Sequence, residues 1–267
     1  MNIGISWDAY CEEIEFERQV EIYKENGITN TFLMSEEKDF ENLVPKIQKN
    51  NIIIDTLHAP FRGEQNINAL WLRGRDAKKM MLRLKDGIDK CEKFGIPVLV
   101  VHVSSGDKAP HINDLGYKRF SSLYEYSQKK NVKLAFENQR KIANLAFMLE
   151  QFENAGFCWD CGHEAAFAYG RQYMPMFGER LCALHIHDNF GKHNGDNHMI
   201  PFDAGIDFER VTSQIASSGY TGTMMLELGR NHTDFYKNCS PEEYFKKGAE
   251  AAKKLAKMTE EKRNKIC

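Results

Sequence analysis

The sequence of 267 residues lacks the features of a secreted or membrane protein. Its first ten residues, MNIGISWDAY, contain neither the basic nor the apolar segment of a signal peptide. No apolar run approaches the roughly 18 residues needed to cross a membrane. The 7 cysteines are odd in number and irregularly spaced, which argues against a disulfide framework. We therefore expect a cytoplasmic protein whose cysteines are mostly free thiols, many of them buried.

The chain also lacks a strong excess of charge. A formal net charge of −2 and a pI of about 6.5 give no broad basic face for nucleic acid. The segment after the first predicted strand, SWDAYCEE, is not the glycine-rich phosphate turn of an open doubly wound sheet. Hydrophobic residues make up 42% and charged residues 28% of the chain, as in an ordinary globular protein with a sizeable core.

Eight short apolar runs alternate with longer amphipathic stretches. The runs predicted as strands are 2–6, 28–34, 52–58, 97–103, 132–138, 156–160, 182–187 and 222–228. The stretches predicted as helices include 16–27, 76–95, 117–131, 145–156, 207–219 and 240–258. No linker or composition break divides the chain, so we expect an α/β fold with one domain, a closed parallel (β/α)₈ TIM barrel over residues 1–258. Residues 259–267 are expected to form a charged, frayed tail.

Polar residues gather at the carboxyl ends of these strands. The period-two alternation along a strand puts Glu137 and Glu227 on the inner face of the barrel. The other members of this set are His58, His102, Asp160, His163, His185, His187, Asp196 and His198. The carboxyl ends of barrel strands build the active site, and imidazole with carboxylate suits zinc, manganese, iron or cobalt. Any one of these residues alone is as readily a core hydrogen-bonding group, but the whole set predicts a metal site.

The stretch FCWDCGHE, residues 157–164, has two interpretations. Cys158 and Cys161 form a C-x-x-C pair, which is typical of redox and zinc motifs; alternatively, Asp160 and His163 are metal ligands and the cysteines are incidental. A redox pair needs its first cysteine at a helix N-terminus, whereas Cys158 is predicted in mid-strand. No second cysteine pair has zinc-ribbon spacing. We therefore predict that Asp160 and His163 are ligands and that both cysteines are small core residues.

At this point the chain resembles the xylose isomerase-like TIM barrels, which include sugar isomerases, sugar epimerases and the apurinic-site endonucleases of AP endonuclease family 2. The motifs that carry the resemblance are LHAPF (57–61), VVHVSSG (100–106), AFEN (135–138), WDCGH (159–163), HIHDN (185–189), DNH (196–198), GIDF (205–208), GYTG (219–222) and LEL (226–228). They span nearly the whole chain in the family's order. The resemblance implies the barrel and a homo-oligomer, but no single activity, because one fold hosts several chemistries.

The two branches of the family imply different metal centres. The isomerase and epimerase branch implies one divalent ion (Mn, Zn, Co, Fe or Mg) held by Glu137, Asp160, His185 and Glu227. There, Glu137 and Glu227 would also move a substrate proton through an enediolate. The endonuclease branch implies up to three zinc ions on a larger set that adds His58, His102, His163, Asp196 and His198, and hydrolysis of abasic DNA.

We favour a sugar or sugar phosphate isomerase or epimerase with a small-molecule carbohydrate substrate. A multinuclear zinc phosphodiesterase is the alternative, and the slightly acidic chain disfavours it because binding to a phosphate backbone draws on several Lys and Arg residues. The third interpretation is a non-catalytic sugar-binding barrel. It is disfavoured because loss of chemistry usually deletes a carboxylate ligand, and no core ligand is missing.

Candidate substrate-binding residues lie mainly in the loop after the third predicted strand, FRGEQNINALWLRGRDA. Phe61 and Trp71 would stack on a sugar ring, as would Trp7 after the first strand. Arg62 or Arg73 would hold an anionic group. The alternative left open is that Trp71 packs under the loop and the arginines are solvated.

His187 is the least certain candidate of the set. It shares a strand face with His185 and is predicted either to orient a ligand and contact the substrate or to make only a structural hydrogen bond.

Overall fold

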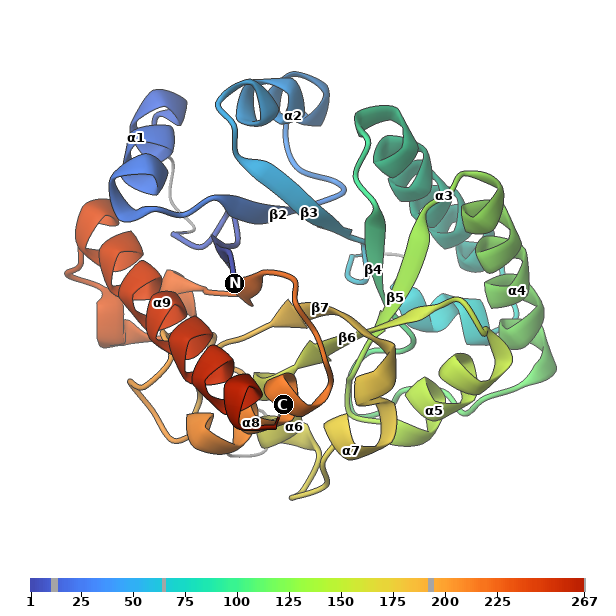
Figure 1. Ribbon diagram of the computed structural model, residues 1–267. Coiled ribbons are helices and arrows are strands. Elements are labelled where there is room, and N and C mark those ends of the chain that lie inside the picture. Colours follow the sequence, from blue (N-terminus) through green and yellow to red (C-terminus); the bar gives the residue numbers. More distant parts are fainter. Residues whose placement is uncertain (11–13, 64–65, 192–194, 267) are drawn as a thin grey trace.

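The computed structural model describes residues 1–10, 14–63, 66–191 and 195–266. Eight parallel strands form one sheet in the order β7-β6-β5-β4-β3-β2-β1-β8, with helices around its outside (Figure 1). The strands are β1 (Ile3–Ile5), β2 (Asn30–Met34), β3 (Ile53–His58), β4 (Val98–His102), β5 (Lys133–Glu137), β6 (Gly156–Asp160), β7 (Leu181–His185) and β8 (Met224–Leu226). A parallel bridge between Ile186 and Leu226 joins the two edges of the sheet. The predicted single-domain barrel is thereby confirmed.

The helices follow the predicted alternation. They are α1 (Phe16–Asn26), α2 (Phe40–Lys49), α3 (Asp76–Phe94), α4 (Asp114–Lys129), α5 (Ile142–Gln151), α6 (Cys161–Phe167), α7 (Met174–Phe177), α8 (Phe208–Ser217) and α9 (Pro241–Ile266), with 3₁₀ turns η1 (Ile67–Trp71), η2 (Gly178–Arg180), η3 (Arg230–His232) and η4 (Asp234–Tyr236). α2 was not predicted. It forms although Pro45 lies inside it, because Phe40, Val44 and Ile47 are buried on one face. None of the described helices is long and apolar enough to span a membrane.

The last helix runs further than predicted. The sequence pattern predicts an end at residue 258, but α9 continues to Ile266. Thr259 is buried, and Lys262 Nζ donates to Glu209 O at 2.6 Å and to Thr212 Oγ1 at 2.7 Å on α8. The predicted helix end is therefore wrong, because contacts with α8 hold the charged segment in helical form.

The barrel interior carries the site on top of an apolar layer. Val98, Val100, Ala135, Cys158 and Ala183 form a small buried cluster of their own, separate from the core between sheet and helices. Two residues further along the same strands stand His102, Glu137, Asp160 and His185, all buried. The period-two alternation of each strand thus points these polar side chains to the same end of the barrel.

The described cysteines are free thiols, as predicted, and Cys91, Cys158 and Cys161 are buried. Cys158 lies inside β6, and Cys161 begins α6, where its Sγ donates to His187 O at 3.5 Å. Cys11 and Cys267 lie outside the described residues.

Two register shifts place extra residues at the amino end of the barrel. The pairing of β2 with β3 steps from Thr31–Ile54 to Phe32–Thr56, which leaves Asp55 as the additional residue. The pairing of β6 with β7 likewise leaves Cys182 unmatched. Asp55 and Cys182 both line a cavity of about 180 Å³ at this end.

Candidate metal centre

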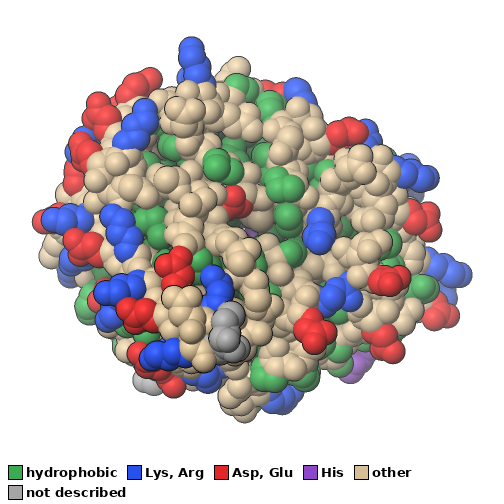
Figure 2. Space-filling model, viewed as in Figure 1, with side chains coloured by type: hydrophobic (Ala, Val, Ile, Leu, Met, Phe, Trp, Pro, Cys, Tyr) green, Lys and Arg blue, Asp and Glu red, His purple; other side chains and the backbone are tan. Residues whose placement is uncertain are grey.

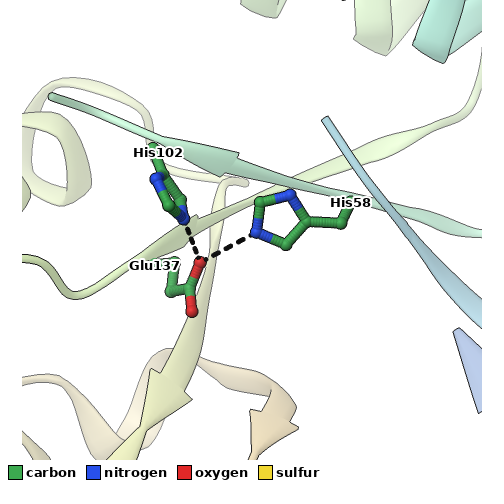
Figure 3. Close-up of side chains that lie close together, drawn as sticks. All are labelled: His58, His102 and Glu137. Carbon is green, nitrogen blue, oxygen red and sulfur yellow. Dashed lines mark hydrogen bonds and ion pairs between the residues drawn. The ribbon is translucent and has the colours of Figure 1, made fainter. Parts of the chain in front are cut away.

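Glu137, at the end of β5, is enclosed by four histidines. Its Oε2 lies 2.6 Å from His102 Nε2 and 3.1 Å from His58 Nε2 (Figure 3). Its Oε1 lies 3.1 Å from His185 Nδ1 and 3.5 Å from His163 Nδ1. Burial raises the pKa of Glu137, but the charges of His102 and His185 outweigh it and hold the pKa well below its usual value. Both carboxylate oxygens are therefore engaged in an ionised state.

A second cluster adjoins the first through His163. Its Nε2 lies 3.3 Å from Asp196 Oδ2, and the other oxygen of Asp196 lies 3.4 Å from His198 Nε2. Asp160 closes β6 and caps α6, because its Oδ1 accepts the backbone N–H of His163 at 2.6 Å. The same Oδ1 lies 3.2 Å from His187 Nε2. These side chains meet although they come from strand β6, helix α6 and the loop after β7.

Glu227, just after β8, connects the two clusters. Its Oε2 lies 3.3 Å from His185 Nδ1 and 4.0 Å from His198 Nδ1. The side chain of Glu227 is 17% exposed and that of Asp196 is 23% exposed, whereas that of Glu137 is fully buried. Glu227 and Asp196 are therefore the carboxylates of the centre that solvent or a substrate can reach.

Four histidines present the same ring atom to carboxylates. The Nδ1 atoms of His58, His163, His187 and His198 lie against the backbone oxygens of Ala59 (2.8 Å), Asn138 (3.1 Å), Asp188 (3.5 Å) and Glu227 (3.1 Å). A carbonyl only accepts, so the Nδ1 atoms of His58, His187 and His198 carry a hydrogen, and the Nε2 of each neutral ring is then a lone pair; His163 Nδ1 also lies 3.0 Å from the amide nitrogen of Gln139. Each Nε2 faces a carboxylate oxygen, which also only accepts. Two facing acceptors need a proton or a cation between them, and a carbonyl-anchored ring is typical of metal-ligating histidine.

Several buried polar atoms of the centre have no hydrogen-bond partner, which also indicates a cation site. Within the described chain they include His102 Nδ1, Asp160 Oδ2, His185 Nε2, His187 Nε2, Asp196 Oδ1 and Glu227 Oε2. Several groups have candidate ligand atoms within 4.8 Å of one another, among them His58 with His102 and Glu137, His58 with His185 and Glu227, and His163 with Asp196 and His198. Unsatisfied buried polar atoms are costly, so the donor set fits one or more divalent cations. Cys158 lies within reach of Glu137 and His185, but burial raises the pKa of its thiol well above its usual value and disfavours the thiolate.

Two histidines of the centre, His185 and His198, favour the protonated form when no cation is bound, whereas His102 does not. Burial lowers the pKa of His185 and His198, but nearby carboxylates outweigh it and raise each to about 9. The charges of Glu227 and Glu137 raise the pKa of His185 most. The contact with Asp196 raises the pKa of His198 most. Burial prevails at His102 and lowers its pKa to about 4. Metal binding would therefore displace protons from this cluster.

A cavity of about 450 Å³ lies over the centre. It is lined by His58, His102, His163, Asp196, His198 and Glu227, but not by Glu137, Asp160 or His185. The predicted ligands therefore form two layers. Glu137 is buried beneath its histidines, whereas Glu227 faces the cavity, and proton transfer by either residue stays a prediction.

Two of the predicted substrate-binding residues line the cavity. Phe61 packs against His102, with ring centroids 4.1 Å apart, and the Arg62 guanidinium lies over the Phe61 ring at 4.7 Å. Trp71 takes the second of its two predicted placements. Its indole is 2% exposed, donates to Val103 O at 2.7 Å and packs so closely on Gly116 that a Cβ there would lie 2.0 Å from the ring. Trp71 therefore packs under the loop and has no free face for a sugar.

The remaining predicted contacts lie away from the cavity. Arg73 is exposed and does not line it, and half-buried Trp7 packs against Phe16 and Tyr23. His187 is completely buried, so its predicted contact with substrate is wrong.

Asp188, beside His187, has a structural task. Its carboxylate accepts the backbone N–H groups of Asn189, Phe202, Ala204 and Ile206 at 2.8–3.0 Å. These bonds close the loop that carries Asp196 and His198.

Sequence reasoning missed several residues of the cavity. Asp8 follows β1, and burial and the Glu227 charge raise its pKa. Gln139 lies within 3.2 Å of His102 Nε2 and 3.0 Å of His163 Nδ1, and His232 packs edge-on against His198. Asp8 and Gln139 come directly after strands, and that position was the signal available for finding them.

Comparison with known proteins extends these observations. Residues 18–255 match the family described as xylose isomerase-like TIM barrel. The uncharacterised protein y4fM of Sinorhizobium fredii is 29% identical over 196 residues, which are 66% of this chain and 62% of that protein. The chain spans about three fifths of the length of the curated relatives that it matches.

Two solved structures share the fold at low identity. D-psicose 3-epimerase from Clostridium cellulolyticum H10, solved with D-tagatose, superposes with a TM-score of 0.78 at 14% identity and covers 97% of this chain and 99% of its own. The IolI protein with a bound zinc atom has a TM-score of 0.73 at 16% identity and covers 98% of this chain and 99% of its own. With the family match extending over most of its length, the chain belongs to the xylose isomerase-like TIM barrel family.

Proposed function

We propose that this protein is a divalent-metal-dependent enzyme that isomerises or epimerises a small carbohydrate by moving a proton on carbon. One observation carries the proposal: carbonyl-anchored histidines direct Nε2 lone pairs at carboxylates on the floor of a cavity sized for a sugar. One structural neighbour is a sugar 3-epimerase and the other holds a zinc atom, and both support the same function.

The residues that would hold the cation follow from the geometry. Glu137, His185 and Glu227 meet at His185 Nδ1, and Asp160 Oδ2 is the nearby buried oxygen without a partner. The other two groups, around His58 and His198, would hold further ions or contact sugar hydroxyls. A bound divalent cation would polarise adjacent substrate oxygens and make the neighbouring C–H more acidic.

The protein's own groups would then move the proton. Glu227 is the centre's carboxylate that faces the cavity beside β1 and β8, so proton removal is assigned to it. Asp8 is a second carboxyl group lining the cavity, within electrostatic reach of Glu227, and we assign the return of the proton to it. Glu137 keeps a ligand role. Phe61 would support the sugar ring from the cavity wall.

A multinuclear metal phosphodiesterase is the second candidate. The two additional ligand groups, His58 with His102 and Glu137, and His163 with Asp196 and His198, favour it because each is assembled on its own. The charge distribution opposes binding to DNA: Lys and Arg side chains are interspersed with Asp and Glu over the face shown in Figure 2, and the net charge is −2.

The test is carbon–hydrogen exchange in heavy water by protein purified without added metal or chelator. Aldoses, ketoses and their phosphates are incubated with the protein and examined by mass spectrometry, while metal content is measured on the same sample. We expect deuterium incorporation into one of these sugars, at least about one equivalent of metal per chain, and loss of exchange after chelation. Metal-replete protein that exchanges no sugar but nicks abasic DNA would establish the second candidate, and protein that binds no metal on titration would refute both.

A further inference from the structure

Three guanidinium groups of the described residues line the cavity, and two of them form ion pairs with carboxylates. Arg83 donates Nε and Nη2 to the two oxygens of Glu36, both at 2.6 Å. Arg140 donates Nε to Asp107 Oδ1 at 2.8 Å. Arg62 forms no ion pair with any carboxylate in the described part of the chain. Its charge is therefore available to a ligand.

The position of Arg62 is set from two sides. Its guanidinium lies over the ring of Phe61, which packs in turn against His102 of the metal centre. Its backbone oxygen accepts from Arg83 Nη1 at 3.3 Å, so the Glu36–Arg83 pair also holds this segment. A stacked guanidinium loses less freedom on binding than a freely solvated one. The cavity wall thus presents a preorganised cation above the histidines.

No described carboxylate of the cavity forms an ion pair with this guanidinium. His232 lines the cavity beside His198, and the two rings lie edge to face with centroids 4.6 Å apart. An imidazole there can form a hydrogen bond to a ligand. The carboxylates on the floor, Asp196 and Glu227, face histidines instead.

We propose that the substrate carries an anionic group, a phosphate or a carboxylate, which Arg62 binds at the side of the cavity while the sugar hydroxyls face the metal centre. This inference rests on the proposed function and adds the class of substrate. The planar fork of arginine matches both oxyanions in a bidentate way. A cavity of about 450 Å³ accommodates a pentose or hexose with one such substituent.

The test is calorimetric binding to the protein as purified, with its metal, at low ionic strength. The probes are D-ribose 5-phosphate, D-ribonate and neutral D-ribose. We expect one charged probe to bind about tenfold or more tightly than ribose, and which of the two does so identifies the anion. Arg62→Gln should abolish this preference, so that the charged probe binds no more tightly than ribose does. Arg73→Gln is the matched control, because Arg73 is exposed nearby and does not line the cavity.

Three results would overturn the inference: no preference of the wild-type protein for a charged probe, a preference that survives Arg62→Gln, or an equal loss in Arg73→Gln. A surviving preference would assign anion binding to the metal centre itself. Failure of the proposed function is separable from these results. A protein that loses its anion preference in Arg62→Gln but exchanges no sugar proton contradicts only the isomerase proposal. A protein that exchanges protons of neutral sugars without dependence on Arg62 contradicts only this inference.

Discussion

The two ends of the barrel interior differ in how their buried polar groups are paired. At the amino end, the single carboxylate of Asp55 accepts a hydrogen bond from Asn30 at 2.7 Å and another from Thr223, so neutral donors satisfy it. At the carboxyl end, carboxylates face histidine lone pairs, and several buried atoms lack partners. One end is complete as a protein structure, while the other holds facing acceptors that a proton or a cation would satisfy. Locally unsatisfied groups of this kind are typical of functional sites.

The same contrast recurs along strand β6. Gly156 begins the strand and Gly162 lies just beyond its end, in α6. A Cβ at Gly156 would lie 2.1 Å from Cys182 Sγ, and one at Gly162 would lie 1.9 Å from His187 Cε1. Both glycines leave room for a neighbouring side chain. At the amino end that neighbour fills space, whereas at the carboxyl end it points a ring nitrogen at Asp160.

The largest expected effect comes from Glu227→Gln at the carboxyl end. The amide keeps the shape of the side chain but cannot remove a proton, so the exchange rate should fall about 100- to 10,000-fold. The urea midpoint of the metal-free protein should change little. Deuterium incorporation and urea unfolding measure the two quantities. Retained exchange in this variant would refute the proton-transfer role of Glu227.

A smaller functional loss is expected for Gly162→Ala. The added methyl group forces His187 away from Asp160, so metal affinity should fall about 10- to 100-fold, as when a group that orients a ligand is lost. Competition with a chromogenic chelator measures this affinity. Gly205→Ala is the control, because a Cβ there meets nothing closer than 3.6 Å and the affinity should not change. Equal metal affinity in both variants would show that His187 does not orient a ligand of the metal centre.

At the amino end, Gly156→Ala should affect stability instead of function. Overpacking against Cys182 should lower the free energy of unfolding by about 1–3 kcal/mol, while metal content and turnover per folded molecule stay unchanged. Adding Cys182→Ala to the same chain removes the clashing sulfur and should restore most of the loss. A fall in metal content of the folded single variant would erase the distinction between the two ends.

The smallest effect is expected for Asp55→Asn, and it depends on pH. Burial raises the pKa of Asp55, opposed by hydrogen bonds from Thr223 and Asn30. The folded state therefore holds this proton more tightly than the unfolded chain, and stability falls as pH rises from the ordinary Asp pKa through the raised one. The variant removes that penalty and should be more stable than the wild type at pH 7. The gain should vanish near pH 4 in thermal unfolding at the two pH values.

Strand alternation made most of the centre predictable. Once eight strands were identified, the two-residue period placed His102, Glu137, Asp160 and His185 on one face and at one end, where the structure has them. The same reasoning could not rank these residues by depth. Glu137 and Glu227 look alike in sequence, but only the packing of four histidines shows that the former is sealed and the latter open.

Other misses have equally specific causes. Trp71 and Arg62 lie in one loop, and composition alone cannot tell which side chain turns inward; the absence of a Cβ at Gly116 makes room for the indole. Asp55 and Cys182 reach the amino-end cavity through register shifts that no residue pattern marks. The end of α9 was misplaced because a charged tail was assumed to have no partner, whereas α8 supplies one.

The loop after β7 is closed by one carboxylate and four main-chain N–H groups. Because Phe202, Ala204 and Ile206 contribute their backbone N–H groups, proline, which has no N–H, is incompatible with those positions. Phe202 has a φ of 80°, which β-branched side chains rarely adopt, and Ala204 and Ile206 pack against the core, so these side chains are constrained as well. One buried carboxylate thus fixes the path of the chain that follows Asp196 and His198, and its loss would leave four N–H groups without their acceptor at once.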